Sequence, residues 1–134
     1  MKSTLTQILL AILAPLTMAI AAPVAAPVTP VTPVTKVNVN GHDVLADRNG
    51  MTAYVFDEDK TANSVCYGGC AKNWPPILLE ASEQVTAPFS VSVRKDNARQ
   101  INFNGHPIYR FAGDFKSGEA KGDGLANTWH VIPQ

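Results

Sequence analysis

Two stretches of this chain share one aromatic and acidic pattern, and their spacing constrains the fold more than any other feature. Residues 54–59 (Y-V-F-D-E-D) recur as residues 109–114 (Y-R-F-A-G-D), both of the form Y-x-F-x-x-D. A tryptophan follows each tyrosine after twenty residues. The joint spacing indicates an internal duplication. The motif residues are Tyr54, Phe56, Asp59, Trp74, Tyr109, Phe111, Asp114 and Trp129.

A second match extends the repeat toward the N-terminus. Asn40-Gly41-His42 is repeated as Asn104-Gly105-His106. On this match, the first copy carries an insertion before its tyrosine. We therefore place the repeats at about 37–79 and 99–132.

Short runs of alternating apolar and polar residues predict strands, and no long amphipathic pattern predicts a helix. Asn-Gly pairs between the runs are typical of hairpin turns. One helical turn is expected at Cys70–Asn73, before Pro75-Pro76. The fold class predicted is mainly β, a small single domain built from two related β-hairpin repeats with short helical turns and long loops. Its expected strands lie at 37–40, 43–56 (a hairpin turning at 48–50), 89–93, 101–103, 106–111 and 129–132.

The N-terminus has the pattern of a signal peptide over residues 1–21. Lys2 supplies a positive charge, the run from Ile8 to Ala22 is apolar, and small residues precede the expected cleavage after Ala21. The mature protein is then periplasmic or secreted, with no stable membrane span. The alternative is an uncleaved N-terminal anchor, which the short apolar run disfavours.

Residues 22–35 carry a proline at every third or fourth position and little charge. This composition predicts an extended Pro-rich linker, and a tail without function fits it equally well. The folded domain is then expected over residues 36–134.

Strand spacing puts Tyr54 and Phe56 on one face, and likewise Tyr109 and Phe111. We expect these four rings to meet in one core, with the tryptophans covering its ends and each motif Asp accepting hydrogen bonds from turn N–H groups. The alternative is an exposed aromatic groove that binds an apolar or carbohydrate ligand.

The two cysteines, Cys66 and Cys70, enclose Tyr67-Gly68-Gly69. In an exported protein this spacing favours a structural disulfide. The alternative is a Cu(I) site made by both thiolates with His106, or a thiol-redox pair.

Other function classes find little support. Lys and Arg number 11, as do Asp and Glu, so there is no basic surface for nucleic acid. Asp57-Glu58-Asp59 lacks the pattern of a Ca²⁺ loop, and no nucleophile motif is present. We therefore expect no enzyme and no cofactor. His42 and His106 both follow Asn-Gly turns, where a surface position is the simplest reading; a shared metal site would need them to converge.

The chain resembles the secreted or lipoprotein repeat family of unknown function that carries a Y-x-[FWY]-x-x-D motif. The resemblance rests on both motifs, on the segment Cys66–Cys70 and on Trp74-Pro75-Pro76. It implies an exported envelope protein. Many members are lipoproteins, but this leader has no cysteine near its cleavage point. Some relatives are linked to growth on alkanes.

Together, these features predict a non-enzymatic binding or structural module of the cell envelope. Its partner is an unknown small ligand or an envelope protein. The alternatives are a copper-handling or thiol-redox protein that uses Cys66 and Cys70, and an envelope protein linked to the use of alkanes or other hydrophobic compounds.

Overall fold

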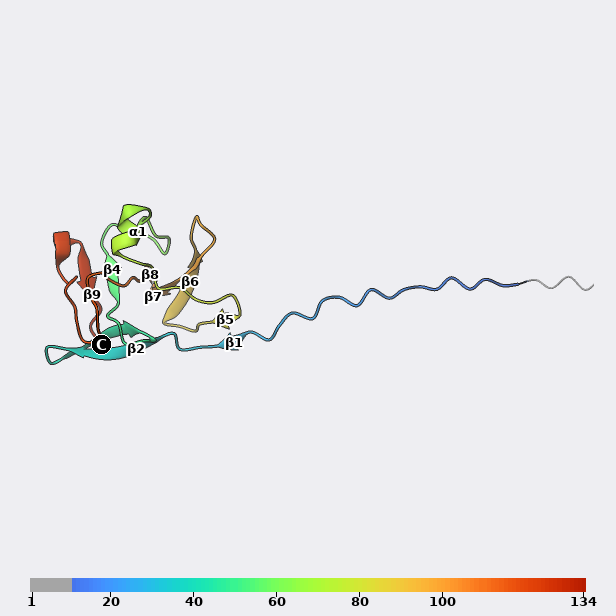
Figure 1. The fold of residues 1–134 in the computed structure, drawn as a ribbon, viewed down its shortest axis with the longest axis horizontal. Helices are drawn as coiled ribbons and strands as arrows, with labels where there is room; N and C mark the ends of the chain where they lie inside the picture. The colour runs from blue at the N-terminus through green and yellow to red at the C-terminus, as the bar shows by residue number, and fades with distance from the viewer. Residues whose placement is uncertain (1–10) are drawn as a thin grey trace, which may run out of the picture.

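The computed structural model describes residues 11–134. Residues 11–28 carry no helix or strand and extend away from the folded part as an exposed segment (Figure 1). None of the helices in the described range is long and apolar enough to cross a membrane. The first ten residues of the predicted signal peptide, 1–21, lie outside the described residues, so this leader stays a prediction.

Two β-hairpins, one in each half of the chain, supply the longest strands. In the first, β2 (Val34–Val39) pairs antiparallel with β3 (His42–Asp47). In the second, β6 (Phe89–Val93) pairs antiparallel with β7 (Arg99–Phe103). The first hairpin turns at Asn40-Gly41, whose φ angles of 50° and 88° are those that a two-residue hairpin turn requires.

A short strand follows each hairpin. In the first half this strand is part of the Y-x-F-x-x-D motif, and in the second half it precedes the motif. β4 (Tyr54–Phe56) comes after a tight turn in which Gly50 N–H donates to the Asp47 carbonyl oxygen, 2.9 Å away. In the second half, β8 (His106–Pro107) pairs with β7 and continues directly into the second motif. The hairpin predicted over 43–56 therefore turns where expected, but its last strand, β4, pairs elsewhere.

The segment that begins at each tryptophan, here called a tryptophan segment, pairs with the strand that carries the Y-x-F-x-x-D motif of the other half. β9 (Trp129–Val131) lies beside β4 (Figure 1). In the other direction, Arg110 N–H donates to the Pro75 carbonyl oxygen at 2.8 Å. Between the motif strands, Tyr54 and Tyr109 exchange two backbone hydrogen bonds of 2.8 and 3.0 Å. The halves are therefore intertwined about an approximate two-fold axis that passes between these tyrosines.

Matching backbone contacts show which strands correspond in the two halves. Leu45 N–H donates to the Ile132 carbonyl oxygen at 2.8 Å, just as Ile101 N–H donates to the Ile77 carbonyl oxygen at 2.9 Å. β3 therefore corresponds to β7, and β2 to β6. The duplication is confirmed, but its second copy begins at β6 and not at residue 99, where the sequence had suggested.

The predicted match between Asn40–His42 and Asn104–His106 is wrong. The two-residue turn Asn104-Gly105 joins β7 to β8. The turn that follows β3 at the equivalent position is 48–50, which has three residues. Asn49-Gly50 is therefore its counterpart, whereas Asn40-Gly41 corresponds to the loop 94–98 between β6 and β7. Asn-Gly suits any tight turn, so an identical tripeptide did not identify equivalent turns.

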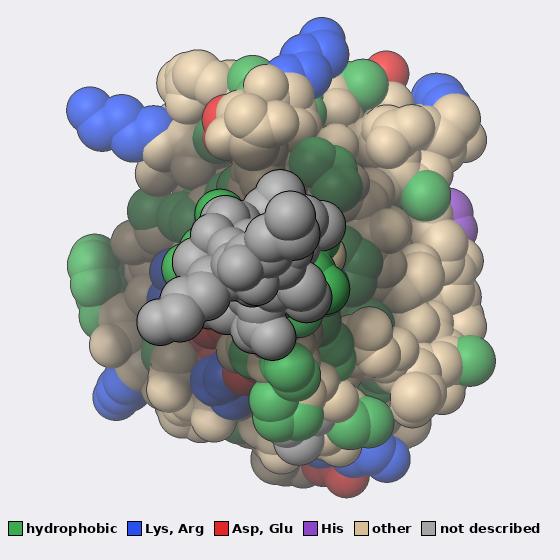
Figure 2. Space-filling view, turned by 90° about the vertical axis from the view of Figure 1, so that its right-hand side faces the viewer, with side chains coloured by type: hydrophobic (Ala, Val, Ile, Leu, Met, Phe, Trp, Pro, Cys, Tyr) green, Lys and Arg blue, Asp and Glu red, His purple; other side chains and the backbone are tan. Residues whose placement is uncertain are grey.

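The last residues of the predicted linker are part of the fold. β1 (Thr29–Pro30) pairs in parallel with β5 (Glu83–Gln84), and Val34 is buried. Val31 packs against the aliphatic core. The linker predicted over 22–35 is thus shorter, because valines between its prolines reach the core. In the view along the extended segment, Lys and Arg project mainly from the periphery of the molecule (Figure 2).

The interior has an aliphatic part and an aromatic part. The aromatic part lies around the two tyrosines and is described below. Two short helices, α1 (Gly69–Asn73) and η1 (Leu125–Asn127), stand just before the two tryptophans, and α1 confirms the predicted helical turn. The fold is a small, mainly β domain of two repeats. Its aliphatic cluster consists of Val34, Leu45, Ala53, Ile77, Leu79, Ile101, Ile108 and Ile132.

Candidate functional site

Four motif rings form one column at the junction of the two halves. Phe56 stacks on Trp129 with ring centroids 4.1 Å apart, and Trp129 stacks on Trp74 at 3.8 Å. Trp74 contacts Phe111 at 4.5 Å with the two rings tilted by 32°. The motif aromatics thus meet in one core, as predicted. The prediction that the tryptophans cover its ends is wrong, because strand exchange places each tryptophan beside the phenylalanine of the other half. The two phenylalanines form the ends of the column.

The two tyrosines connect the halves through their hydroxyl groups. Tyr54 Oη donates to Asp114 Oδ2 at 2.6 Å, and Tyr109 Oη donates to Asp59 Oδ2 at 2.6 Å. Each motif therefore binds the acidic residue of the other motif. The sequence offered a signal for this reciprocity, the equal spacing of both motifs, but spacing does not show that the strands are exchanged.

The other oxygen of each motif carboxylate accepts a backbone hydrogen bond. Val65 N–H donates to Asp59 Oδ1 at 2.8 Å, and Lys121 N–H donates to Asp114 Oδ1 at 2.9 Å. The predicted role of these carboxylates in holding turns is confirmed. Both are buried, so each organises a loop from inside the domain.

Burial changes the ionisation of this core. It raises the pKa of the Tyr54 and Tyr109 hydroxyls well above the ordinary value, and the adjacent carboxylates raise it further. Burial also raises the pKa of the Asp59 carboxyl, although its hydrogen bonds and the Arg94 charge act in the opposite direction. Both tyrosines therefore stay neutral donors at physiological pH.

The cysteines are present only in the first half and form a disulfide. The Cys66 and Cys70 sulfurs are 2.04 Å apart, which confirms the predicted bond, and Cys66 is fully buried against the aromatic cluster. Within residues 11–134, no three His, Cys, Asp or Glu side chains lie where they could together hold a metal ion. The alternative set of Cys66, Cys70 and His106 is thus not brought together.

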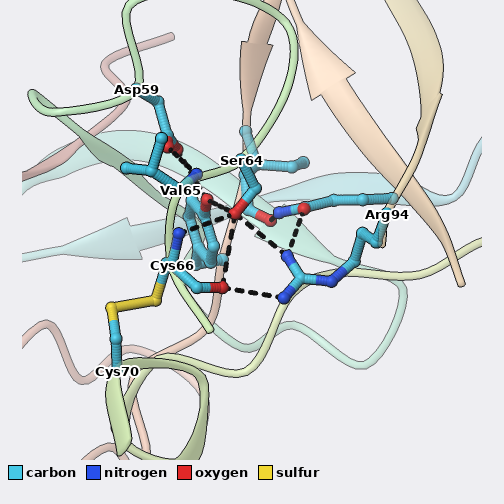
Figure 3. The surroundings of a disulfide bond; sticks show 9 residues. Asp59, Ser64, Val65, Cys66, Cys70 and Arg94 are labelled. Carbon is cyan, nitrogen blue, oxygen red and sulfur yellow. Dashed lines mark hydrogen bonds between the residues drawn. A yellow bond between two sulfur atoms is a disulfide. The ribbon is translucent and has the colours of Figure 1, made fainter. Parts of the chain in front are cut away.

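A buried arginine holds the chain around this disulfide. Arg94 donates to Ser64 Oγ at 3.0 Å, to Gln100 Oε1 at 2.7 Å and to the Cys66 carbonyl oxygen at 2.7 Å (Figure 3). Its guanidinium also lies 4.3 Å from the centroid of the Tyr67 ring. Sequence reasoning missed Arg94, because a charged residue at a turn looks like a solvated one.

Through Ser64, this arginine is connected to the motif pair. Ser64 Oγ lies 2.7 Å from Tyr109 Oη, which in turn donates to Asp59. A continuous hydrogen-bonded chain therefore runs from Arg94 to the Asp59 carboxylate. In the part of the chain that the structure describes, the equivalent hydroxyl, that of Tyr54, accepts one hydrogen bond, from the backbone N–H of Gly122 at 3.2 Å.

An open cavity of about 580 Å³ lies at the Phe56 end of the column. Apolar side chains make most of its wall, and charged side chains gather at one part of it. Sequence reasoning singled out Phe56, Asp59 and His106 from this set but not the apolar residues around them. The cavity is lined by Val55, Phe56, Asp57, Asp59, Lys60, Phe103, Asn104, His106, Val131, Ile132 and Pro133.

The corresponding place in the other half holds a smaller, polar cavity of about 230 Å³. Arg110 stands where the first cavity has Val55, and Asp47 stands where it has Phe103. Arg110 Nη1 lies 3.8 Å from Asp47 Oδ2, so an ion pair occupies the position of two apolar side chains. One backbone frame therefore carries an apolar cavity on one side and a charged one on the other.

The three histidines lie at three different places in the fold. His106 lines the apolar cavity, whereas His42 lines a groove near β9. His130 Nε2 lies 2.9 Å from Asp57 Oδ2 at the surface. The equivalence predicted for His42 and His106 is wrong, because their turns are not equivalent.

Comparison with known proteins agrees with the two-fold architecture. The family model described as a secreted repeat of unknown function matches residues 37–77 and 90–132, one match for each half. Both matches end in the tryptophan segments, at Ile77 and Ile132. No curated protein and no solved structure matches the chain. The two matches cover more than half of the sequence, and the chain therefore belongs to the family of secreted repeats of unknown function.

Proposed function

We propose that the protein is a non-enzymatic, exported binding module that holds a small apolar molecule in the cavity beside Phe56. The observation that carries this proposal is the contrast between the two equivalent cavities. In the first cavity, Val55 and Phe103 leave an apolar space. At the equivalent positions of the second cavity, Arg110 and Asp47 form an ion pair.

The size and chemistry of the cavity suit a small ligand. Its volume of about 580 Å³ falls within the range of small-molecule sites, which are mostly apolar with few polar groups. Phe56 and Phe103 offer ring surfaces, and Asp59 and Asn104 offer polar atoms for orientation. Hydrocarbon-like compounds, the class suggested by resemblance in the sequence, fit these walls.

A binding role suits the cavity better than catalysis. Among its lining residues there is no serine, threonine or cysteine that could act as a nucleophile. Asp59 already accepts two hydrogen bonds that fix its loop. A thiol-redox role receives no support either, because Cys66 is fully buried. We propose a periplasmic location; the family description supports export, since it names secretion.

An NMR titration of the oxidised domain with naphthylmethanol, a neutral aromatic probe, tests this proposal. Saturable shifts should centre on the backbone amides of Val55, Phe103 and Val131. Equivalent shifts should be absent around Arg110. A titration without saturable shifts, or with shifts centred on another surface, would overturn the proposed function.

A further inference from the structure

We propose that the cavity selects apolar molecules that carry a protonated amine, and that the Asp59 carboxylate binds this amine. Arg94 is then a positioning residue, which acts on Asp59 through Ser64 and Tyr109. This inference rests on the proposed function, since it names the class of ligand for the same cavity.

The Asp59 carboxylate has acceptor capacity left for a ligand. Each carboxylate oxygen accepts one hydrogen bond, from Val65 N–H and from Tyr109 Oη. An ionised carboxylate has about four acceptor sites, so acceptor capacity remains. Asp59 is only 4% exposed and lies in a mostly apolar wall. A ligand that enters beside it must present a donor, and a charged donor gains most.

The chain from Arg94 fixes the direction of these hydrogen bonds. Tyr109 has one hydroxyl hydrogen, and it is donated to Asp59 at 2.6 Å. Ser64 Oγ accepts from Arg94 at 3.0 Å and from Cys66 N–H at 3.0 Å, and it lies closer to Tyr109 Oη, at 2.7 Å, than to the Cys66 carbonyl oxygen, at 3.4 Å. We assign its own hydrogen to Tyr109 Oη, because the hydrogen of Tyr109 is donated to Asp59. Val65 N–H and Tyr109 Oη then orient the lone pairs of Asp59.

The charges around Asp59 come from several elements. From its own loop, Asp57 and Lys60 line the cavity; from strand β8, His106 does. Asp57 is paired with His130 of β9 at 2.9 Å, and Lys60 Nζ donates to the Asp57 carbonyl oxygen at 2.6 Å.

Against the cost of burial, the guanidinium of Arg94 favours the ionised form of Asp59. Neutral Tyr109 contributes a donor and no charge. Asp57 and Lys60 are exposed, where water weakens their attraction for a ligand, whereas Asp59 is buried and is the charged group of the wall most suited to a ligand.

Two asymmetries of the duplicated fold coincide on this side. The apolar cavity lies beside Asp59. The pair that Asp59 forms with Tyr109 is also the pair that Ser64 and Arg94 hold. On the other side, the partners of Tyr54 and Asp114 within residues 11–134 are the backbone N–H groups of Gly122 and Lys121, and no side chain braces the pair. A brace needed for the fold alone would be expected on both sides.

The first experiment compares three probes with one ring system on the oxidised domain: naphthylmethylamine, naphthylmethanol and naphthoate. We expect the amine to bind about tenfold more tightly than the alcohol, as a charge-assisted hydrogen bond predicts, and naphthoate to bind most weakly. Asp59→Asn should remove the preference for the amine, so that amine and alcohol bind with similar affinity.

The outcomes separate this inference from the proposed function. Equal binding of amine and alcohol, or tightest binding of naphthoate, would overturn the selection for amines while the apolar site stands. Binding of none of the three would overturn both.

The second experiment addresses Arg94 by the pH dependence of amine binding. Amine binding to the unaltered domain should weaken as the pH falls through the raised pKa of Asp59, while alcohol binding stays constant. Arg94→Gln should raise the pH at which amine binding is lost, because it removes a positive charge that favours ionised Asp59. Arg94→Lys should return this pH part of the way to that of the unaltered domain. If Arg94→Gln weakens both probes alike, Arg94 only supports the fold and the positioning role is wrong.

If Arg94→Gln does not fold, Tyr109→Phe provides the same test, since it removes the last link to Asp59. A pH-independent amine affinity in the unaltered domain would also contradict the role of an ionised Asp59.

Discussion

The hydroxyl of Tyr109 donates a 2.6 Å hydrogen bond to the carboxylate of Asp59, which belongs to the other half of the duplicated chain. Tyr54 and Asp114 repeat this relationship in the opposite direction at the same distance. The repetition of the motif in this chain thus has a physical reason. The tyrosine of each motif donates to the aspartate of the other motif, so neither half has all its hydrogen-bond partners alone.

Removal of either hydroxyl should destabilise the domain. Tyr109→Phe and Tyr54→Phe each leave a buried carboxylate without its strongest neutral donor, and we expect each to lower the free energy of unfolding by about 1.5–3 kcal/mol. Urea unfolding measures this loss. Tyr67→Phe is the matched control, because its hydroxyl accepts only from Lys95 N–H at the exposed surface. Equal, small losses in all three variants would contradict the account.

Strand exchange predicts that the halves fold only together. Fragments 22–86 and 87–134, cut in the loop before β6, each lack the tryptophan segment that pairs with their motif strand. Each fragment should be unfolded alone, and an equimolar mixture should recover the β-type circular dichroism of the intact domain. A fragment that folds cooperatively by itself would show that the exchange is not needed for stability.

The disulfide should contribute modestly to stability. Cys66 and Cys70 close a ring of five residues, so loss of the bond in a Cys66→Ala/Cys70→Ala variant should cost about 2 kcal/mol. Urea unfolding of the variant and of the oxidised domain measures the difference. A variant as stable as the oxidised domain would contradict a structural role, and loss of all β structure would mean that the bond is far more important than its ring size suggests.

Alkaline pH should unfold the domain. In the folded state burial raises the pKa of Tyr54 and Tyr109 above the ordinary value of 10.0, which applies to the unfolded chain. Their contribution to stability is therefore complete below pH 10 and is lost as the pH rises above it. Tyrosinate absorbance should appear for these two residues only together with unfolding. Their ionisation in a domain that keeps its fold would refute this prediction.

The sequence predicted the class of this fold well, because alternating strands, Asn-Gly turns and the repeated motif are local signals. It also predicted the disulfide, since Cys66 and Cys70 are close in sequence. The strand exchange was not predictable, because β4 and β9 are far apart in the chain and either pairing satisfies the same alternation.

The cavity was harder still to predict. Val55 and Phe103 look like ordinary strand residues, and their meaning appears only when Arg110 and Asp47 are seen at the equivalent positions. The wrong match of Asn40-Gly41 with Asn104-Gly105 concealed this equivalence. Arg94 escaped notice for a related reason, since its burial depends on the segment around Ser64 that folds over it.

The apolar cavity is the central feature of the proposed function, and one substitution tests its role most directly. Val55→Arg places in this cavity the side chain that the equivalent position already carries as Arg110, so the backbone should accept it. Arg110→Val is the matched control in the other half.

Calorimetric titration with naphthylmethanol gives the decisive comparison. We expect Val55→Arg to weaken binding at least about tenfold with little change in the urea midpoint, because a guanidinium fills and polarises the cavity. Arg110→Val should bind like the unaltered domain. Unchanged affinity in a folded Val55→Arg variant, or an equal loss in Arg110→Val, would contradict the assignment of the cavity beside Phe56 as the binding site.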